Sequence, residues 1–149
     1  MSYWDTACLI KIHVDEPDST TFRRFLEERD EVVVSGEFSR MEFFATVWRK
    51  EADREIGEGW ARKNLHDFDE TIRKGGCRMI AVDDEVRTEF ERVIERCYTN
   101  TPPVVIRMLD ALHIAAALTA GETEIVATDR RLREAATLLG FQLFPTPTP

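Results

Sequence analysis

The sequence lacks the long apolar runs of a membrane protein. None of its 149 residues lies in a stretch that approaches the roughly 20 apolar residues of a membrane-spanning helix. Asp5 and Lys11 interrupt the apolar stretch near the N-terminus, which is not typical of a signal peptide. We therefore expect a cytoplasmic protein that makes no membrane contact.

The sequence also lacks the common motifs for zinc binding, for catalytic triads and for nucleotide phosphates. The three cysteines form no Cys-x-x-Cys pair, so we expect reduced core thiols and no zinc site. His13 and His66 have no partner at metal-ligand spacing, and Ser, Cys and His show no arrangement typical of a catalytic triad. No Walker loop and no G-x-G-x-x-G motif occurs. The acidic residues therefore remain as candidates for chemistry.

Positive charge is in short supply, with 20 Lys and Arg against 28 Asp and Glu and a net charge of −8. Such a balance does not favour non-specific binding to nucleic acid, which depends on Lys and Arg. It does not exclude a nucleic-acid enzyme, because an acidic metal site itself adds negative charge. The 43% of hydrophobic residues suits a folded domain with a core.

Short apolar segments alternate with helical patterns along the whole chain. The predicted strands are Ser2–Trp4, Glu31–Ser35, Cys77–Val82, Glu124–Thr128 and Phe141–Phe144. Helical periodicity follows Asp5 and recurs over residues 19–29, 37–50, 58–74, 84–97, 107–120 and 130–139. This alternation predicts an α/β domain with a parallel sheet and helices on both faces. We expect one domain over residues 1–144 and a flexible tail over residues 145–149.

Two acidic residues follow predicted strands, Asp5 after the first and Asp129 after the fourth. Sites in parallel sheets gather at the carboxyl ends of strands, so both side chains would share a crevice if these strands are neighbours. Thr6 and Thr128 could donate hydrogen bonds to such a cluster. The alternative is ordinary helix capping, by Asp5 or Thr6 in the first case and by Asp129 in the second.

Two further acidic residues lie within predicted helices. Glu42 is at the edge of an apolar stripe that includes Met41, Phe44 and Trp48, and the alternative for it is an ion pair with Arg40 or Arg49. Asp110 is on a helix with apolar or small residues on nearly every side. A buried carboxylate needs a metal ion or another cation beside it, and the alternative is an internal pair with Arg107. We expect His113, on the same helix, to be a hydrogen-bonded core residue.

Four segments together resemble the PIN domain, in particular the VapC-type toxins of toxin–antitoxin pairs. They are Tyr3–Lys11 (YWDTACLIK), Ser39–Glu42 (SRME), Arg107–Ala115 (RMLDALHIA) and Ala127–Leu132 (ATDRRL). The similarity covers essentially the whole chain, and the segments around Asp110 and Asp129 are its most specific parts. Trp4 and Cys8 stand where such sequences often have smaller residues, and neither change affects a carboxylate.

The resemblance implies a three-layer α/β/α domain whose five parallel strands have the order 3-2-1-4-5. It also implies a Mg²⁺- or Mn²⁺-dependent endoribonuclease that forms a homodimer and is inhibited by a small antitoxin protein. Carboxylate oxygens are ligands that both ions prefer. We expect the catalytic and metal-binding set to be Asp5, Glu42, Asp110 and Asp129, with water activated by one or two ions attacking the RNA phosphodiester.

Three arginines close to these carboxylates in sequence, Arg107, Arg130 and Arg131, are candidates for RNA phosphate contacts. Exposed charge pairing is an equally good explanation for them. Three other functions remain open: a PIN domain that binds a partner without cutting, a nuclease acting on DNA, and a phosphatase with Asp5 as nucleophile. The last is disfavoured because haloacid-dehalogenase-like enzymes have a second Asp where this chain has Ala7.

Overall fold

Five short strands form one parallel sheet in the computed structural model, which describes residues 1–147. The strands are β1 (Tyr3–Trp4), β2 (Val33–Gly36), β3 (Cys77–Ile80), β4 (Glu124–Val126) and β5 (Gln142–Phe144). Their order is β3-β2-β1-β4-β5, which confirms the predicted fold class and places β1 beside β4. This adjacency is what the two strand-end carboxylates require to share a crevice.

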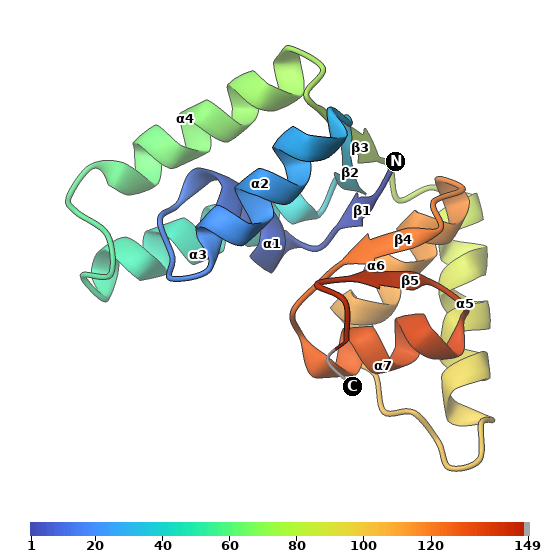
Figure 1. Ribbon diagram of the computed structural model, residues 1–149. Helices are drawn as coiled ribbons and strands as arrows, with labels where there is room; N and C mark the ends of the chain where they lie inside the picture. Colours follow the sequence, from blue (N-terminus) through green and yellow to red (C-terminus); the bar gives the residue numbers. More distant parts are fainter. Residues whose placement is uncertain (148–149) are drawn as a thin grey trace.

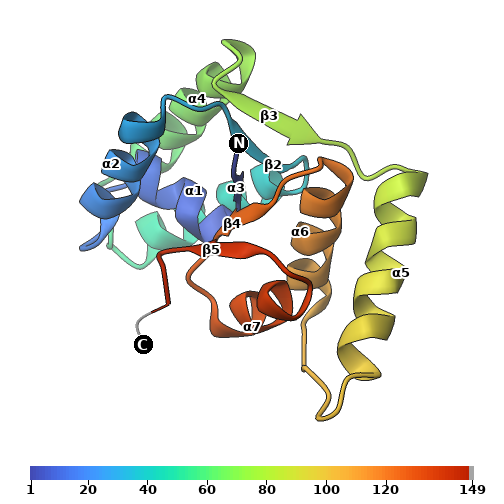
Figure 2. The same ribbon diagram turned by 45° about the vertical axis from the view of Figure 1, so that its right-hand side comes forward.

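Seven helices connect and cover the strands. They are α1 (Thr6–His13), α2 (Ser19–Arg29), α3 (Ser39–Ala52), α4 (Trp60–Arg73), α5 (Asp84–Tyr98), α6 (Met108–Thr119) and α7 (Arg130–Leu138). Figures 1 and 2 show α1 to α4 gathered on one side of the sheet and α5 to α7 on the other. Among residues 1–147, no helix combines the length and apolarity needed to cross a membrane.

The sheet separates two hydrophobic cores because successive strand residues point to opposite faces. In β1, Tyr3 packs into the core under α5, α6 and α7, whereas Trp4 packs into the core under α1 to α4. In β4, Ile125 packs into the same core as Tyr3, and Val126 packs into the same core as Trp4. The three cysteines are buried and unpaired in these cores, as expected of core thiols.

The buried face of α3 differs from the predicted one. Met41 and Phe44 are exposed, and Phe43 and Val47 are buried instead. Phe43 stacks on Phe68 of α4 with 4.5 Å between ring centroids, so the contact between the two helices decides which stripe is covered. Glu42 consequently lies beside the buried stripe, directly next to Phe43.

The chain after β5 is held at its first residue, where the carbonyl of Pro145 accepts a 2.7 Å hydrogen bond from Arg133 Nη2. Residues 148 and 149 of the expected tail lie outside the described residues. The flexible tail over residues 145–149 and the domain boundary at residue 144 therefore stay predictions.

Candidate active site

The carboxyl ends of β1 and β4 bring Asp5 and Asp129 to one edge of the sheet. Tyr3 and Trp4 pair with Ile125 and Val126, and the Asp5 N–H donates to the Val126 carbonyl at 3.1 Å. Asp129 follows β4 by three residues and precedes α7. Both residues therefore directly precede a helix, and both lie at the edge of the sheet where open α/β folds have their binding sites.

Both residues also cap the helices that follow them, so the predicted capping role is confirmed for both. Asp5 Oδ1 accepts from the Cys8 N–H at 2.8 Å, so Asp5 and not Thr6 is the cap of α1. Asp129 Oδ1 accepts from the N–H groups of Arg131 and Leu132 at 2.9 and 3.2 Å. Each cap uses one carboxylate oxygen, Oδ1, and the second oxygen of each residue takes no part in capping.

Asp5 is a buried carboxylate without a cation. It is only 4% exposed, and within residues 1–147 no Lys or Arg forms an ion pair with it. Burial raises the pKa of Asp5, and this effect outweighs the opposing effects of His113 and of the hydrogen bond with Cys8. The ionised form of such a carboxylate is stabilised by a nearby cation, and within residues 1–147 no Lys or Arg side chain provides one.

Glu42 reaches the same region from α3 and is held by two neighbours. Its Oε1 accepts hydrogen bonds from Thr6 Oγ1 at 2.7 Å and from His113 Nε2 at 2.9 Å. Burial acts to raise the pKa of Glu42, but His113 and Thr6 outweigh burial and lower it. Arg40 and Arg49 pair with other carboxylates, so the suggested pairing of Glu42 with either arginine is wrong.

His113 is a hydrogen-bonded core residue, as expected, and in addition it holds Glu42. The Gly36 N–H donates to the Tyr3 hydroxyl oxygen, which leaves the hydroxyl proton free to be donated to His113 Nδ1 at 2.9 Å. His113 Nε2 then carries the proton that is donated to Glu42. The contact was not predicted, although His113 lies three residues after Asp110 on α6 and so shares its face.

Asp110 is buried at the start of α6 and forms the internal ion pair that was the alternative for it. Arg107 Nε donates to Asp110 Oδ2 at 2.7 Å, and Arg107 Nη2 donates to Oδ1 at 3.1 Å. The same Nη2 lies 2.9 Å from Asp129 Oδ2. One guanidinium therefore links two of the four predicted carboxylates, from α6 to the start of α7.

The four carboxylates are suitable ligands for a divalent ion, although their side chains do not converge on a single point. A cavity of about 330 Å³ opens here and is lined by Glu42, Arg107, Met108, Leu109 and Asp110. Within residues 1–147, no three His, Cys, Asp or Glu side chains converge as a metal-binding group. The donors are carboxylate oxygens, which suit Mg²⁺ and Mn²⁺, and buried Asp5 lacks the cation that such an ion would provide.

The side chains of three other predicted residues form no hydrogen bond or ion pair with the four carboxylates in the described part of the chain. Thr128 is exposed and, in the part of the chain that is described, donates no hydrogen bond to any of the four. Arg130 and Arg131 are exposed at the start of α7, and neither side chain forms an ion pair within residues 1–147. Both arginines are therefore free to meet an anionic ligand.

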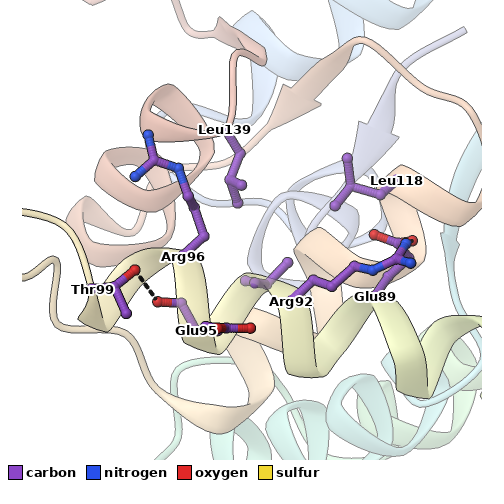
Figure 3. A pocket seen from close by; sticks show the side chains of 8 residues that line it. Glu89, Arg92, Glu95, Arg96, Thr99, Leu118 and Leu139 are labelled. Carbon is purple, nitrogen blue, oxygen red and sulfur yellow. Dashed lines mark hydrogen bonds and ion pairs between the residues drawn. The ribbon is translucent and has the colours of Figure 1, made fainter.

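A second cavity, of about 460 Å³, lies among α5, α6 and α7 and shares no lining residue with the first (Figure 3). Val93, Leu118 and Leu139 contribute its apolar lining. Among its charged residues, Arg92 pairs with Glu89 on the same helix. None of the four carboxylates borders this cavity, so it has no part in the candidate active site.

Comparison with known proteins identifies the family of the chain. A family model described as the PIN domain matches residues 2–138. The chain is 31% identical over 141 residues to a protein of Mycobacterium tuberculosis (strain ATCC 25618 / H37Rv) named Ribonuclease VapC46. The match covers 93% of this chain and 92% of that relative.

Proposed function

The chain belongs to the PIN domain family, and from this premise we propose that it is a Mg²⁺- or Mn²⁺-dependent endoribonuclease, the toxin of a type II toxin–antitoxin pair. The name of its relative, Ribonuclease VapC46, supports RNA as the substrate. The observation that supports metal dependence most strongly is Asp5, which is buried at the carboxyl end of β1 without a compensating cation.

In this proposal Asp5, Glu42, Asp110 and Asp129 hold one or two divalent ions and are the catalytic residues. A bound ion supplies a water of lowered pKa and neutralises charge on the phosphate. Glu42 Oε1 accepts hydrogen bonds from Thr6 and His113. Its other oxygen, Oε2, is therefore the one that can orient the attacking water and accept its proton. In-line attack then gives a 5′-phosphate and a 3′-hydroxyl.

The arginines around the site supply the positive charge that the chain as a whole lacks. Arg130 and Arg131 are exposed at the start of α7, directly after Asp129. A guanidinium binds phosphate oxygens through paired hydrogen bonds, which suits an RNA backbone. We assign these two residues to RNA phosphate contacts, which would steer RNA to one edge of an otherwise acidic protein.

Protein partners are part of the proposal. VapC-type proteins usually form dimers and are inhibited by a small antitoxin. This chain exposes the apolar side chains of Met41 and Phe44 on α3 and of Met108, which lines the cavity beside Asp110. Exposed apolar groups of this size favour protein contacts. Light scattering during size-exclusion chromatography would measure the homodimer, and co-purification of the protein encoded by an adjacent gene would identify the antitoxin.

The proposed function predicts metal-dependent cleavage of RNA. The purified full chain would be incubated with a pool of structured RNAs in Mg²⁺, Mn²⁺ or EDTA. We expect cleavage with either metal, none with EDTA, and 5′-phosphate ends on the products. Asp110→Asn should lose the activity while keeping a native circular dichroism spectrum, and survival of cleavage in that variant would show that the site is wrongly assigned.

Two alternatives are tested by the same assay. A folded protein that binds metal and cuts none of the RNAs would favour a PIN domain that acts by binding a partner. Faster cleavage of matched DNA oligonucleotides would instead identify a deoxyribonuclease. The presence of all four carboxylates favours an active nuclease over a binding module.

A further inference from the structure

The oxygens of Asp110 and Asp129 are already occupied by hydrogen-bond donors. Arg107 fills both Asp110 oxygens, through Nε and Nη2. Asp129 Oδ1 is taken by two backbone N–H groups of α7, and its Oδ2 is taken by Arg107 Nη2. While the guanidinium stays where it is, its positive charge opposes a metal ion at either carboxylate, and neither carboxylate has an oxygen without a hydrogen-bond donor or a cation beside it.

The other two carboxylates each keep one oxygen open. Within residues 1–147, Asp5 Oδ2 and Glu42 Oε2 accept no hydrogen bond, while their partner oxygens are fixed by Cys8, Thr6 and His113. The four carboxylates are therefore divided into an open pair and a pair closed by Arg107. Within the described residues, no three His, Cys, Asp or Glu side chains converge as a metal-binding group, which is consistent with this division.

Arg107 is placed so that it can leave without disturbing the fold. Its side chain is 54% exposed, and its backbone is extended at the position just before α6 (φ −85°, ψ 158°). The first helical hydrogen bond uses its backbone carbonyl, which accepts from the Ala111 N–H. Rotation of the side chain toward solvent breaks only the contacts with Asp110 and Asp129.

We propose that Arg107 is a built-in cation that competes with the divalent metal for Asp110 and Asp129. In the metal-free protein the single positive charge of the guanidinium offsets one of the two negative charges and bridges the two carboxylates. A metal ion displaces it, and the released guanidinium then faces the substrate and contacts the RNA phosphate. The inference rests on the proposed metal site and adds to it a residue that sets metal affinity and positions the ligands.

Removal of the competitor should strengthen metal binding. The pair between Arg107 and Asp110 is bidentate and charge-assisted, but it is partly solvent-screened, so we expect a dissociation constant for Mn²⁺ that is roughly tenfold lower in Arg107→Gln. The metal-free variant should also melt at a lower temperature than wild type, because buried Asp110 loses its cation. Mn²⁺ should remove most of that difference.

The chain offers a closely matched control in Arg73→Gln. Arg73 forms the same bidentate pair with a carboxylate three residues away, Glu70, but on α4 and on the surface. The Arg73→Gln substitution also changes the net charge by the same amount as Arg107→Gln. Isothermal titration of the full-length wild type, Arg107→Gln and Arg73→Gln with MnCl₂ should show tighter binding only in Arg107→Gln.

The outcomes separate this inference from the function on which it rests. Wild-type affinity in Arg107→Gln, or weaker binding, overturns the competition and leaves the metal site standing. Tighter binding in both arginine variants overturns it too, because net charge alone would then explain the gain. Absence of Mn²⁺ binding in all three proteins overturns both the inference and the proposed metal dependence.

Discussion

Asp5→Asn is expected to abolish RNA cleavage and, at the same time, to stabilise the metal-free protein. The loss of activity should be roughly 10³-fold or more, because removal of a charged group at a reacting centre typically has an effect of this size. The gain in stability follows from burial, which raises the pKa of Asp5 and so penalises its ionised form in the folded state. A neutral amide avoids that penalty and can still accept the Cys8 N–H.

The stabilisation should depend on pH in a defined direction. The folded protein binds the proton of Asp5 more tightly than the unfolded chain, since the pKa is raised on folding. Wild-type stability therefore falls as the pH rises above the ordinary range of an aspartate. The melting temperature of Asp5→Asn in EDTA should exceed that of wild type at pH 7, by roughly 2–4 °C for each kcal/mol gained, and the two should approach each other in acid.

Asp83→Asn is the matched control for this change. Asp83 also caps a helix that follows a strand, and it accepts from the N–H three residues later, as Asp5 does. Because Asn caps a helix about as well as Asp, and Asp83 is exposed, this exchange removes only a surface charge, so it should leave cleavage unchanged and should not raise the melting temperature. If Asp83→Asn loses as much activity as Asp5→Asn, or if Asp5→Asn destabilises the metal-free protein, the role assigned to Asp5 is wrong.

The second large effect is expected at His113, where substitution by alanine should cost roughly 2–4 kcal/mol of unfolding free energy. The imidazole is buried between Tyr3 and Glu42, and its loss leaves a cavity and removes the partners of a hydroxyl and a carboxylate. Urea unfolding monitored by circular dichroism would measure the change. Cleavage should fall as well, because Glu42 would lose one of the two donors that fix its carboxylate.

Two further variants make the prediction for His113 specific. His66→Ala removes an exposed histidine of α4 and should change stability by less than about 0.5 kcal/mol. His113→Gln retains one acceptor and one donor group, so it should recover part of both stability and activity. Equal effects of the His113→Ala and His66→Ala substitutions would contradict the network described for Tyr3, His113 and Glu42.

Local sequence signals were sufficient for most of the secondary structure. The predicted helix over residues 19–29 matches α2, and the one that begins at Asp84 starts where α5 starts. Helix caps and β-branched runs act through neighbouring residues, so they can be read without knowledge of the fold. The order of the strands came from the resemblance to the PIN domain and not from any local pattern.

The buried face of α3 and the partners of the carboxylates could not be predicted in this way. Both the stripe with Phe43 and Val47 and the stripe with Met41 and Phe44 are apolar, and only packing against α4 selects the first. The internal pair of Arg107 with Asp110 was visible in their spacing. Its extension to Asp129 depends on where α6 lies relative to the start of α7.

Crystals grown in Mn²⁺ would show most directly whether the carboxyl ends of β1 and β4 hold a divalent ion. We expect an anomalous difference peak bounded by Asp5 and Glu42, with the Arg107 guanidinium withdrawn from Asp110 and Asp129. If well-ordered crystals at saturating Mn²⁺ show no peak beside Asp5, or a peak only at another site, the proposed metal site is wrong.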